Sequence, residues 1–140
     1  EPAPAPVAEA LGVAAGADVL ARRKLLIAND VPVRVATSFF RLDLFGGTPI
    51  AEAGDFVRPS LQAAIEALGY RFGHAEEHLV ARPPAGTEAE TLRLDPGEWV
   101  VEVLRTSFAT DGTPVHCLQT VCAASRHVFP IGQVAGADEF

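Results

Sequence analysis

Basic side chains and long apolar segments are both scarce in this sequence. Its 140 residues hold 11 Lys and Arg against 18 Asp and Glu, a formal net charge of -7. A surface that binds nucleic acid needs clustered basic side chains to neutralise phosphates. The largest basic cluster is residues 22–24, whose side chains would alternate between the two faces of a strand. No apolar run approaches the ~20 residues of a membrane span. We therefore expect this segment itself to bind neither nucleic acid nor membrane.

Nothing in the sequence points to export from the cytoplasm. It begins at Glu1 rather than at a methionine, which suggests a processed or excised piece, and it shows no signal-peptide pattern. Cys117 and Cys122 are its two cysteines, and in an expected strand they face opposite ways, ~16 Å apart. A disulfide needs Cα atoms within ~7 Å. Two reduced thiols suit a cytoplasmic protein, and we expect both to be structural.

One motif occurs twice. Residues 23–33 and residues 105–115 each carry an arginine in a mostly apolar run, then an Asn-Asp or Asp-Gly turn, then Pro-Val. Asp-Gly readily adopts the positive φ angles of tight hairpins, and Asn-Asp does so less readily. Proline fits at the first residue of a return strand, where no ladder donor is needed. The repeat therefore predicts two β-hairpins, each with an arginine among apolar neighbours.

The remaining pattern predicts an α+β domain with an antiparallel sheet of five to six strands and two to three helices. Residues 1–6, which alternate proline with other residues, read as an extended linker or tail. The clearest helix begins near residue 58, with Ser60 as N-cap or first-turn hydroxyl and Gly69 at its end. Strands are expected at 18–28, 32–40, 72–82, 99–105, 114–124 and 127–129, and shorter helices at 7–11 and 87–92.

In this order the segments resemble the UTRA domain, the effector-binding module of GntR-type bacterial transcription regulators of the HutC subfamily. The resemblance covers about residues 7–130, and residues 7–140 would form the domain. The matching stretches are 10–13, 23–25, 29–33, 37–40, 59–61, 68–70, 89–92, 103–106 and 111–112.

The resemblance implies a chorismate-lyase-like fold with a small-molecule cleft between the sheet and its helices. It also implies a non-catalytic, dimeric sensor without a cofactor. Ligand binding would change how the dimer presents winged helix-turn-helix domains to DNA, and that domain is absent from this chain.

Candidate ligand-binding residues come from two sources. Arg23, Arg82 and Arg105 lie among apolar neighbours on expected strands, where a guanidinium needs a carboxylate, a carbonyl or a bound anion as partner. The protein partners in reach would be the glutamates at 76, 77 and 102, and the two alternatives are about equally favoured. The resemblance adds three more residues, namely Lys24, Ser60 and His116.

Convergence of these side chains on one cleft would favour an effector that carries a carboxylate or a phosphate. Ser60 would contribute a helix start, where backbone N–H groups and the helix dipole favour an anion. His116 stands where the family has a glutamate. As a neutral ring it could donate to a ligand, although a core or surface position is somewhat more favoured.

Three alternatives to a sensor remain: a zinc site, an enzyme and a purely structural module. Residues 74–78 match the H-x-x-E-H pattern of inverted zinc peptidases, but the pattern needs a helix, and on the expected strand the two histidines lie ~13 Å apart. We expect a solvated strand face and no metal. A chorismate-lyase-like enzyme is the alternative reading of the fold, with Glu102 as the nearest acid. A purely structural oligomerisation module, the third possibility, would need no pocket.

Overall fold

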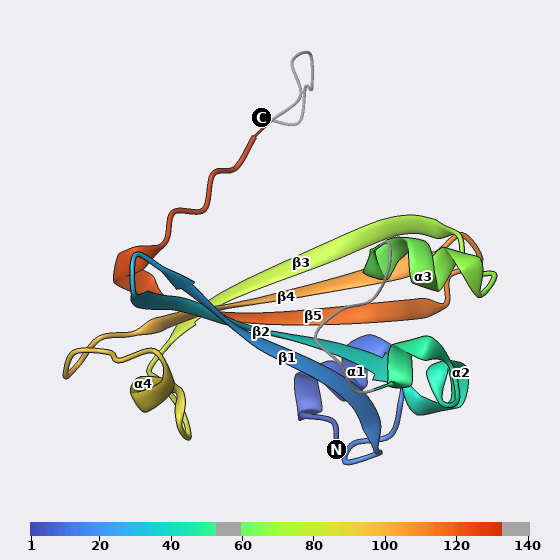
Figure 1. Cartoon of the computed structure of the whole chain (residues 1–140), viewed down its shortest axis with the longest axis horizontal. Helices are drawn as coiled ribbons and strands as arrows, with labels where there is room; N and C mark the ends of the chain where they lie inside the picture. The colour runs from blue at the N-terminus through green and yellow to red at the C-terminus, as the bar shows by residue number, and fades with distance from the viewer. Residues whose placement is uncertain (53–59, 133–140) are drawn as a thin grey trace.

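A five-stranded antiparallel sheet organises the chain (Figure 1). The computed structural model describes residues 1–52 and 60–132. The strands follow the spatial order β1-β2-β5-β4-β3, so that β1 and β3 form the two edges. Their bounds are β1 Val19–Ala28, β2 Val31–Arg41, β3 Phe72–Arg82, β4 Val100–Ala109 and β5 Pro114–Ala123. The helices are α1 Ala5–Leu11, α2 Leu42–Phe45, α3 Leu61–Ala67 and α4 Glu88–Thr91, with 3-10 turns η1 Pro49–Ala51 and η2 Ala124–Arg126.

Both predicted hairpins are present and lie side by side. Asn29 and Asp30 take φ angles of 51° and 63°, the left-handed conformation that a two-residue turn between twisted strands requires. The second turn contains Gly112 with φ of 89°, and the Asp111 carboxylate accepts a hydrogen bond from the Thr113 amide at 2.9 Å. The return strands β2 and β5 pair with each other, so β5 is the central strand and β4 lies between β5 and β3.

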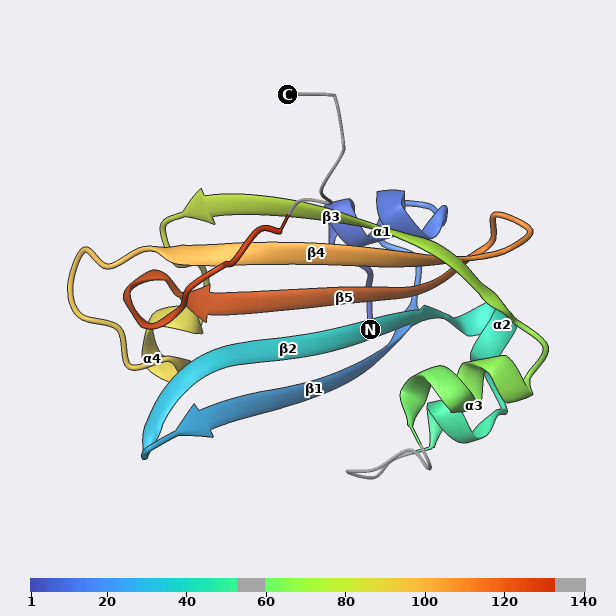
Figure 2. The same ribbon diagram turned by 90° about the horizontal axis from the view of Figure 1, so that it is seen from above.

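Helices cover both faces of the sheet. On one face, here called the α1 face, α1 places Val7 and Leu11 against Phe39 and Cys117. Farther along that face the α4 segment packs through Leu92, and Figure 1 shows α4 near the end of the sheet away from α2 and α3. The opposite face, here called the α3 face, is covered at one end by α2 and α3, in a cluster that includes Phe40, Phe45 and Ile65. Figure 2 shows α2 and α3 gathered at this end.

The N-terminal segment is part of the fold, and its expectation as a free linker or tail is wrong. Pro2 forms a β-bridge with Asp18, and the amide of Ala3 donates to the carbonyl of Ala17 at 2.8 Å. Ala3 is buried, and α1 already begins at Ala5. The prolines cannot donate, but the residues between them can, and proline is tolerated in the first turn of a helix because its missing N–H has no partner there.

The expected final strand at residues 127–129 is also absent. The chain makes the turn η2 after β5, and residues 127–132 then have no regular structure. An alternating segment forms a strand only where a sheet edge accepts it, and β4 and β5 already have neighbours on both sides. Residues 127–129 therefore have the sequence pattern of a strand but no neighbouring strand to pair with.

The other helical predictions are close to the structure. Ser60 is the N-cap of α3, and its hydroxyl accepts a hydrogen bond from the Ala63 amide at 3.1 Å. Residues 58 and 59, where the helix was expected to start, lie outside the described residues. The connection after β2 contains α2 and η1, which brings the α-helices of the described part of the chain to four rather than two to three.

Candidate functional site

A cleft of about 730 Å³ opens on the α1 face, between α1 and the strands β3 and β4. Alternate residues of each strand point into it, as the two-residue period of a strand requires. The polar residues that line it are Glu9 from α1, Glu76 and His78 from β3, and Glu102 and Thr106 from β4. Apolar side chains form the rest of the wall, among them Pro6, Ala10, Val80, Leu104 and Phe108.

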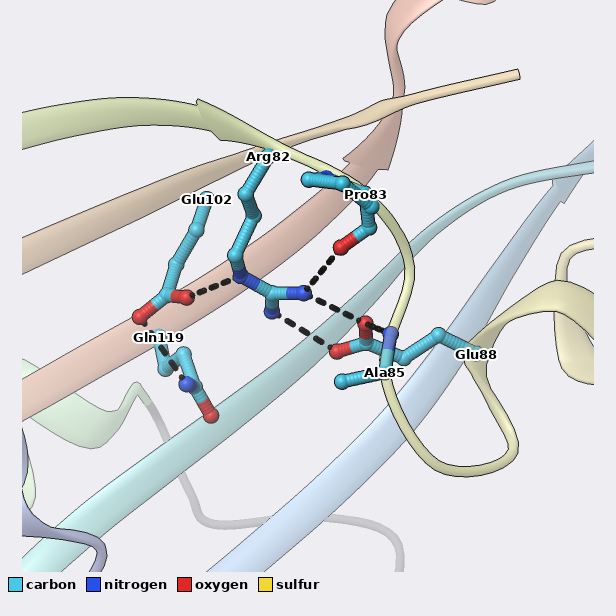
Figure 3. A network of polar contacts seen from close by, with 6 residues as sticks. All are labelled: Arg82, Pro83, Ala85, Glu88, Glu102 and Gln119. Atoms are coloured by element: carbon cyan, nitrogen blue, oxygen red, sulfur yellow. Dashed lines mark hydrogen bonds and ion pairs between the residues drawn. The ribbon is translucent and has the colours of Figure 1, made fainter. Parts of the chain in front are cut away.

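Arg82 anchors a polar network at one end of the cleft (Figure 3). Its Nη1 and Nη2 atoms donate to the two carboxylate oxygens of Glu88, at 2.7 and 2.9 Å. Its Nε donates to Glu102 Oε2 at 2.8 Å, and Gln119 Nε2 donates to Glu102 Oε1 at 3.2 Å. The bidentate contact ties α4 to the end of β3, and the second carboxylate comes from β4. All three guanidinium nitrogens of Arg82 thus donate to carboxylates of its own chain.

The protonation of this network follows from its geometry. The side chains of Arg82, Glu88 and Glu102 are 24%, 22% and 17% exposed, so that water screens their charges only in part. The hydrogen bonds to Glu88 raise the pKa of Arg82. Burial opposes ionisation of Glu88, but the hydrogen bonds from Arg82 and from the Ala85 amide outweigh it and lower the pKa of Glu88. The ion pair therefore persists throughout the neutral range.

Arg23 shares the α1 face with Arg82 but lies at the other edge of the sheet. The register pairs Arg23 with Thr37 and Thr37 with Gln119, from β1 through β2 to β5. Arg23 Nε donates to the Thr37 hydroxyl at 3.1 Å, and its Nη2 contacts Glu1 Oε1 at 2.9 Å. Its side chain is half exposed. The strand order thus separates the two arginines by the width of the sheet.

The other predicted strand residues lie on the α3 face. Lys24 alternates with Arg23 along β1 and pairs with Ala36 of β2. Arg105 Nη1 contacts Glu77 Oε1 at 3.1 Å, with both side chains about half exposed. Two of the three glutamates expected as protein partners are found in ion pairs, Glu102 with Arg82 and Glu77 with Arg105. Glu88, the second partner of Arg82, was not among those expected.

His116 is held in an apolar setting beneath α2. Its ring stacks on Phe40 with centroids 5.0 Å apart and an interplanar angle of 10°. The Nε2 atom is enclosed and finds no hydrogen-bond partner among the described residues. Burial, and to a smaller extent the positive charge of Arg105, lower the pKa of His116 to about 4. His116 is thus partly buried against Phe40, and its contact with a ligand stays a prediction.

Ser60 does not reach the cleft either. Its hydroxyl caps α3, and α3 packs on the α3 face near Phe40 and Ile65. The six residues divide between the two faces of the sheet: Arg23 and Arg82 lie on the α1 face, whereas Lys24, Arg105, His116 and the helix capped by Ser60 lie on the α3 face. A role of any of these residues in effector binding stays a prediction.

Two of the side chains that line the cleft, Glu76 and His78, lie in the H-x-x-E-H segment that the sequence singled out. Glu76 and His78 belong to β3, as expected, so the helical zinc motif is not formed. His74 stacks on Phe108 with centroids 4.6 Å apart, and its Nε2 lies 3.8 Å from Glu76 Oε1. Among residues 1–52 and 60–132, no group of three or more His, Cys, Asp or Glu is placed to hold a metal ion. The period-two pattern places Glu76 and His78 on the same face of the strand. It does not show which face of the sheet a helix covers.

The cysteines match their predicted structural role. Cys117 and Cys122 are both free and buried. Burial raises the pKa of Cys117 to about 11, and burial also raises the pKa of Cys122. A thiol with a raised pKa is a poor nucleophile at neutral pH.

The fold is thus an antiparallel sheet with helices on both faces and a cleft beneath α1. The UTRA domain family model matches residues 1–128. The chain belongs to the UTRA domain family, which confirms the resemblance seen in the sequence.

A curated relative supports this assignment. An uncharacterized HTH-type transcriptional regulator of Streptomyces coelicolor is 40% identical over 126 residues, which is 89% of this chain and 47% of that protein. The chain thus spans about half the length of this relative. In the described part of the chain, no helix combines the length and the apolar character needed to cross a membrane.

Solved structures confirm the fold. The C-terminal domain of YurK from Bacillus subtilis matches with a TM-score of 0.80 at 24% identity, over 94% of this chain and 90% of that one. The effector domain of PhnF from Mycobacterium smegmatis gives 0.76 at 24% identity, over 96% and 82%. The C-terminal domain of the histidine utilization repressor from Pseudomonas syringae gives 0.72 at 22% identity, over 96% and 92%.

Proposed function

We propose that this chain is the effector-sensing domain of a GntR/HutC-type transcription regulator that acts in the cytoplasm. A small molecule bound in the cleft would control DNA binding by a winged helix-turn-helix domain of the full-length protein. The observation that carries the proposal is the cleft itself, which lies between α1 and the sheet of a UTRA domain. The curated relative, about twice as long, is an HTH-type regulator.

An effector that carries a carboxylate or a phosphate was the expectation from the sequence. On the α1 face, Arg23 would be the arginine left to hold such a group, because Arg82 is bonded to Glu88 and Glu102. Arg23 lies on β1, across the sheet from the cleft between α1 and β3–β4. None of the three strand arginines therefore forms part of the lining of this cleft.

The enzyme alternative has little support in the site. Both carboxylate oxygens of Glu102, its nearest candidate acid, accept hydrogen bonds from Arg82 and Gln119. The relative found by sequence is a transcription regulator. A sensor needs only saturable binding without turnover, and binding does not depend on a free acid in the cleft.

The first test is occupancy of the cleft. Native mass spectrometry of the chain purified from its own host should reveal a bound small molecule, and Val80→Trp should abolish its binding by filling the cleft at an exposed edge position. Leu25→Trp, at an exposed position of β1, the other edge strand, is the control and should keep the ligand. Release of 4-hydroxybenzoate from chorismate by the wild-type chain would instead favour the lyase.

We also propose that the chain forms a homodimer through the uncovered part of the α3 face. Leu79 is 48% exposed there, and Val101, Val103 and Leu118 are partly exposed beside it. A contiguous apolar surface of this kind is typical of an interface. Leu79→Asp should weaken self-association at least tenfold in sedimentation velocity. Val80→Asp, the adjacent residue on the α1 face, should leave it unchanged. Equal self-association of the two variants would contradict this interface.

A further inference from the structure

Beyond its last strand the chain continues into an apolar segment, residues 127–132, here called the arm. The arm carries no Asp, Glu, Lys or Arg, and it includes Val128, Phe129 and Ile131. Val128 and Ile131 are 83% and 86% exposed, more than any other large hydrophobic residue in the described part of the chain. An apolar side chain gains free energy from burial only where another surface covers it. The arm therefore presents an apolar surface that its own sheet leaves uncovered.

Arg126 fixes the base of the arm. Its Nη1 donates to the carbonyl of Pro32 in β2 at 2.9 Å, and its Nη2 donates to the carbonyl of Arg93, just after α4, at 2.8 Å. His127 follows with extended backbone angles, φ of -142° and ψ of 142°. Its ring centroid lies 4.5 Å from that of Phe129. The arm thus leaves the sheet from an anchored point.

The arm points away from the face that α1 and α4 cover. Figure 1 shows residues 127–132 rising from the end of the sheet on the side opposite to α1 and α4, and Figure 2 shows them passing in front of β4. This is the side of the α3 face, whose uncovered part carries Leu79, Val101, Val103 and Leu118. An exposed apolar arm and an uncovered apolar surface therefore lie on the same side of one protomer.

A two-fold dimer requires this combination. Each copy presents the same surface in such an interface, so an arm that leaves one protomer on its α3 side meets the α3 face of the other. The few apolar side chains of that face fall short of the about 800 Å² and roughly 20–30 residues that each partner of a stable interface contributes. An extended arm of this length adds about 20 Å of chain to each half of the interface. The arm has no charged side chain to desolvate.

We propose that two copies of this chain exchange their arms, so that Val128 and Ile131 of each copy pack on the uncovered α3 face of the other, against Leu79. This inference rests on the homodimer proposed above and names the segment that holds it together. It also gives a role to the strand pattern of residues 127–129, which has no neighbouring strand in its own sheet. Pro130 has no N–H to donate, so side-chain packing rather than a continuous ladder would hold the arm.

Sedimentation velocity at a series of protein concentrations tests the arm in the whole chain. Val128→Asp should raise the dissociation constant of the dimer at least tenfold, because each of the two arm contacts would then bury a carboxylate. The free energy of unfolding of the monomer should stay unchanged, since Val128 is exposed in its own protomer. Ile27→Asp is the matched control. Ile27 is 55% exposed on the edge strand β1, and its replacement should leave the dissociation constant unchanged.

Mixing two variants distinguishes exchange from an arm that folds back on its own sheet. Val128→Asp damages both arms of its homodimer and Leu79→Asp damages both acceptor faces, whereas a mixed dimer keeps one intact arm on one intact face. We therefore expect the two variants together to associate several-fold more tightly than either alone.

Three results would overturn the exchange. No gain on mixing would show that the arms do not cross between copies. An unchanged dissociation constant for Val128→Asp would remove the arm and leave the dimer through the α3 face standing. A wild-type chain that stays monomeric at every concentration would overturn the arm and the dimer together, whereas the sensing function depends on the separate binding test of the cleft.

Discussion

Replacing Arg82 with methionine should lower the free energy of unfolding by about 2 kcal/mol, because it leaves the carboxylates of Glu88 and Glu102 together without their cation. The estimate lies below the value for a fully buried pair, since these side chains are 17–24% exposed. Chemical denaturation at pH 7 measures it. The long methionine side chain retains most of the packing of the arginine stem, so the loss reports mainly on charge.

Two controls test this explanation. Arg105→Met removes another strand arginine, but the side chains of Arg105 and its partner Glu77 are both about half exposed. The free energy of unfolding should therefore fall by less than about 0.5 kcal/mol. Adding Glu88→Gln to Arg82→Met should restore part of the lost stability, because it removes one unpaired charge. A similar loss for Arg82→Met and Arg105→Met would contradict the proposed role of partial burial.

The Arg82 network should also be visible in acid. The pKa of Glu88 is lowered in the folded chain, because the hydrogen bonds from Arg82 and Ala85 outweigh the opposing effect of burial. Its contribution to stability is therefore complete above the usual pKa of glutamate and is lost as the pH falls through the folded-state value. Arg82→Met should remove most of this acid-side dependence.

His116 should make the domain lose stability on mild acidification. Burial, reinforced by the charge of Arg105, lowers its pKa to about 4 in the folded chain, whereas an unfolded histidine titrates near 6.5. The unfolded state therefore takes up the proton first. The contribution is complete above about pH 6.5 and declines as the pH falls toward 4, with a total loss of about 3 kcal/mol. Urea denaturation at a series of pH values between 7 and 5 measures the slope above the range in which carboxylates titrate.

The matched variants concern two histidines with opposite environments. His116→Leu removes the titration and the unpartnered Nε2 atom while keeping an apolar contact to Phe40, so the stability curve should become nearly flat between pH 7 and 5. It should also be at least as stable as the wild type near pH 6, because no hydrogen bond is lost. His78→Leu, at an exposed position of β3, should keep the wild-type slope. A slope that survives in His116→Leu would place its origin elsewhere.

Local chemistry made much of the fold predictable. The Asn29-Asp30 and Asp111-Gly112 turns, together with alternation on either side, located both hairpins. The first agrees to within one residue at each strand end, whereas β4 continues to Ala109, past its expected end at residue 105. The strand 72–82 was predicted with its observed bounds, and Ser60 was recognised as a cap. These features are set by interactions between residues close together in the sequence. A single sequence shows such local relations directly.

The candidate site was predicted less well, and the reason lies in the order of the strands. Period-two alternation correctly separates Arg23 from Lys24, but it does not relate the faces of two different strands. The register Arg82↔Val100 and the order β1-β2-β5-β4-β3 decide that Arg82 and Glu102 share a face and that Arg23 stands at the far edge. The register and the order of the strands are both set by packing between side chains that are distant in the sequence.

The sequence by itself thus determined the family, the two hairpins, the buried thiols and the alternation of charged residues along each strand. Tertiary structure alone decided which face α1 covers, and with it that the acidic residues lining the cleft there are Glu9, Glu76 and Glu102, with no arginine among the lining residues. It also turned residues 1–6 from an expected linker into the segment that leads into α1 and holds Ala3 in the core. The physical reason is common to both findings: an ion pair or a helix contact needs partners brought together by folding, and the spacing of residues along the chain does not record them.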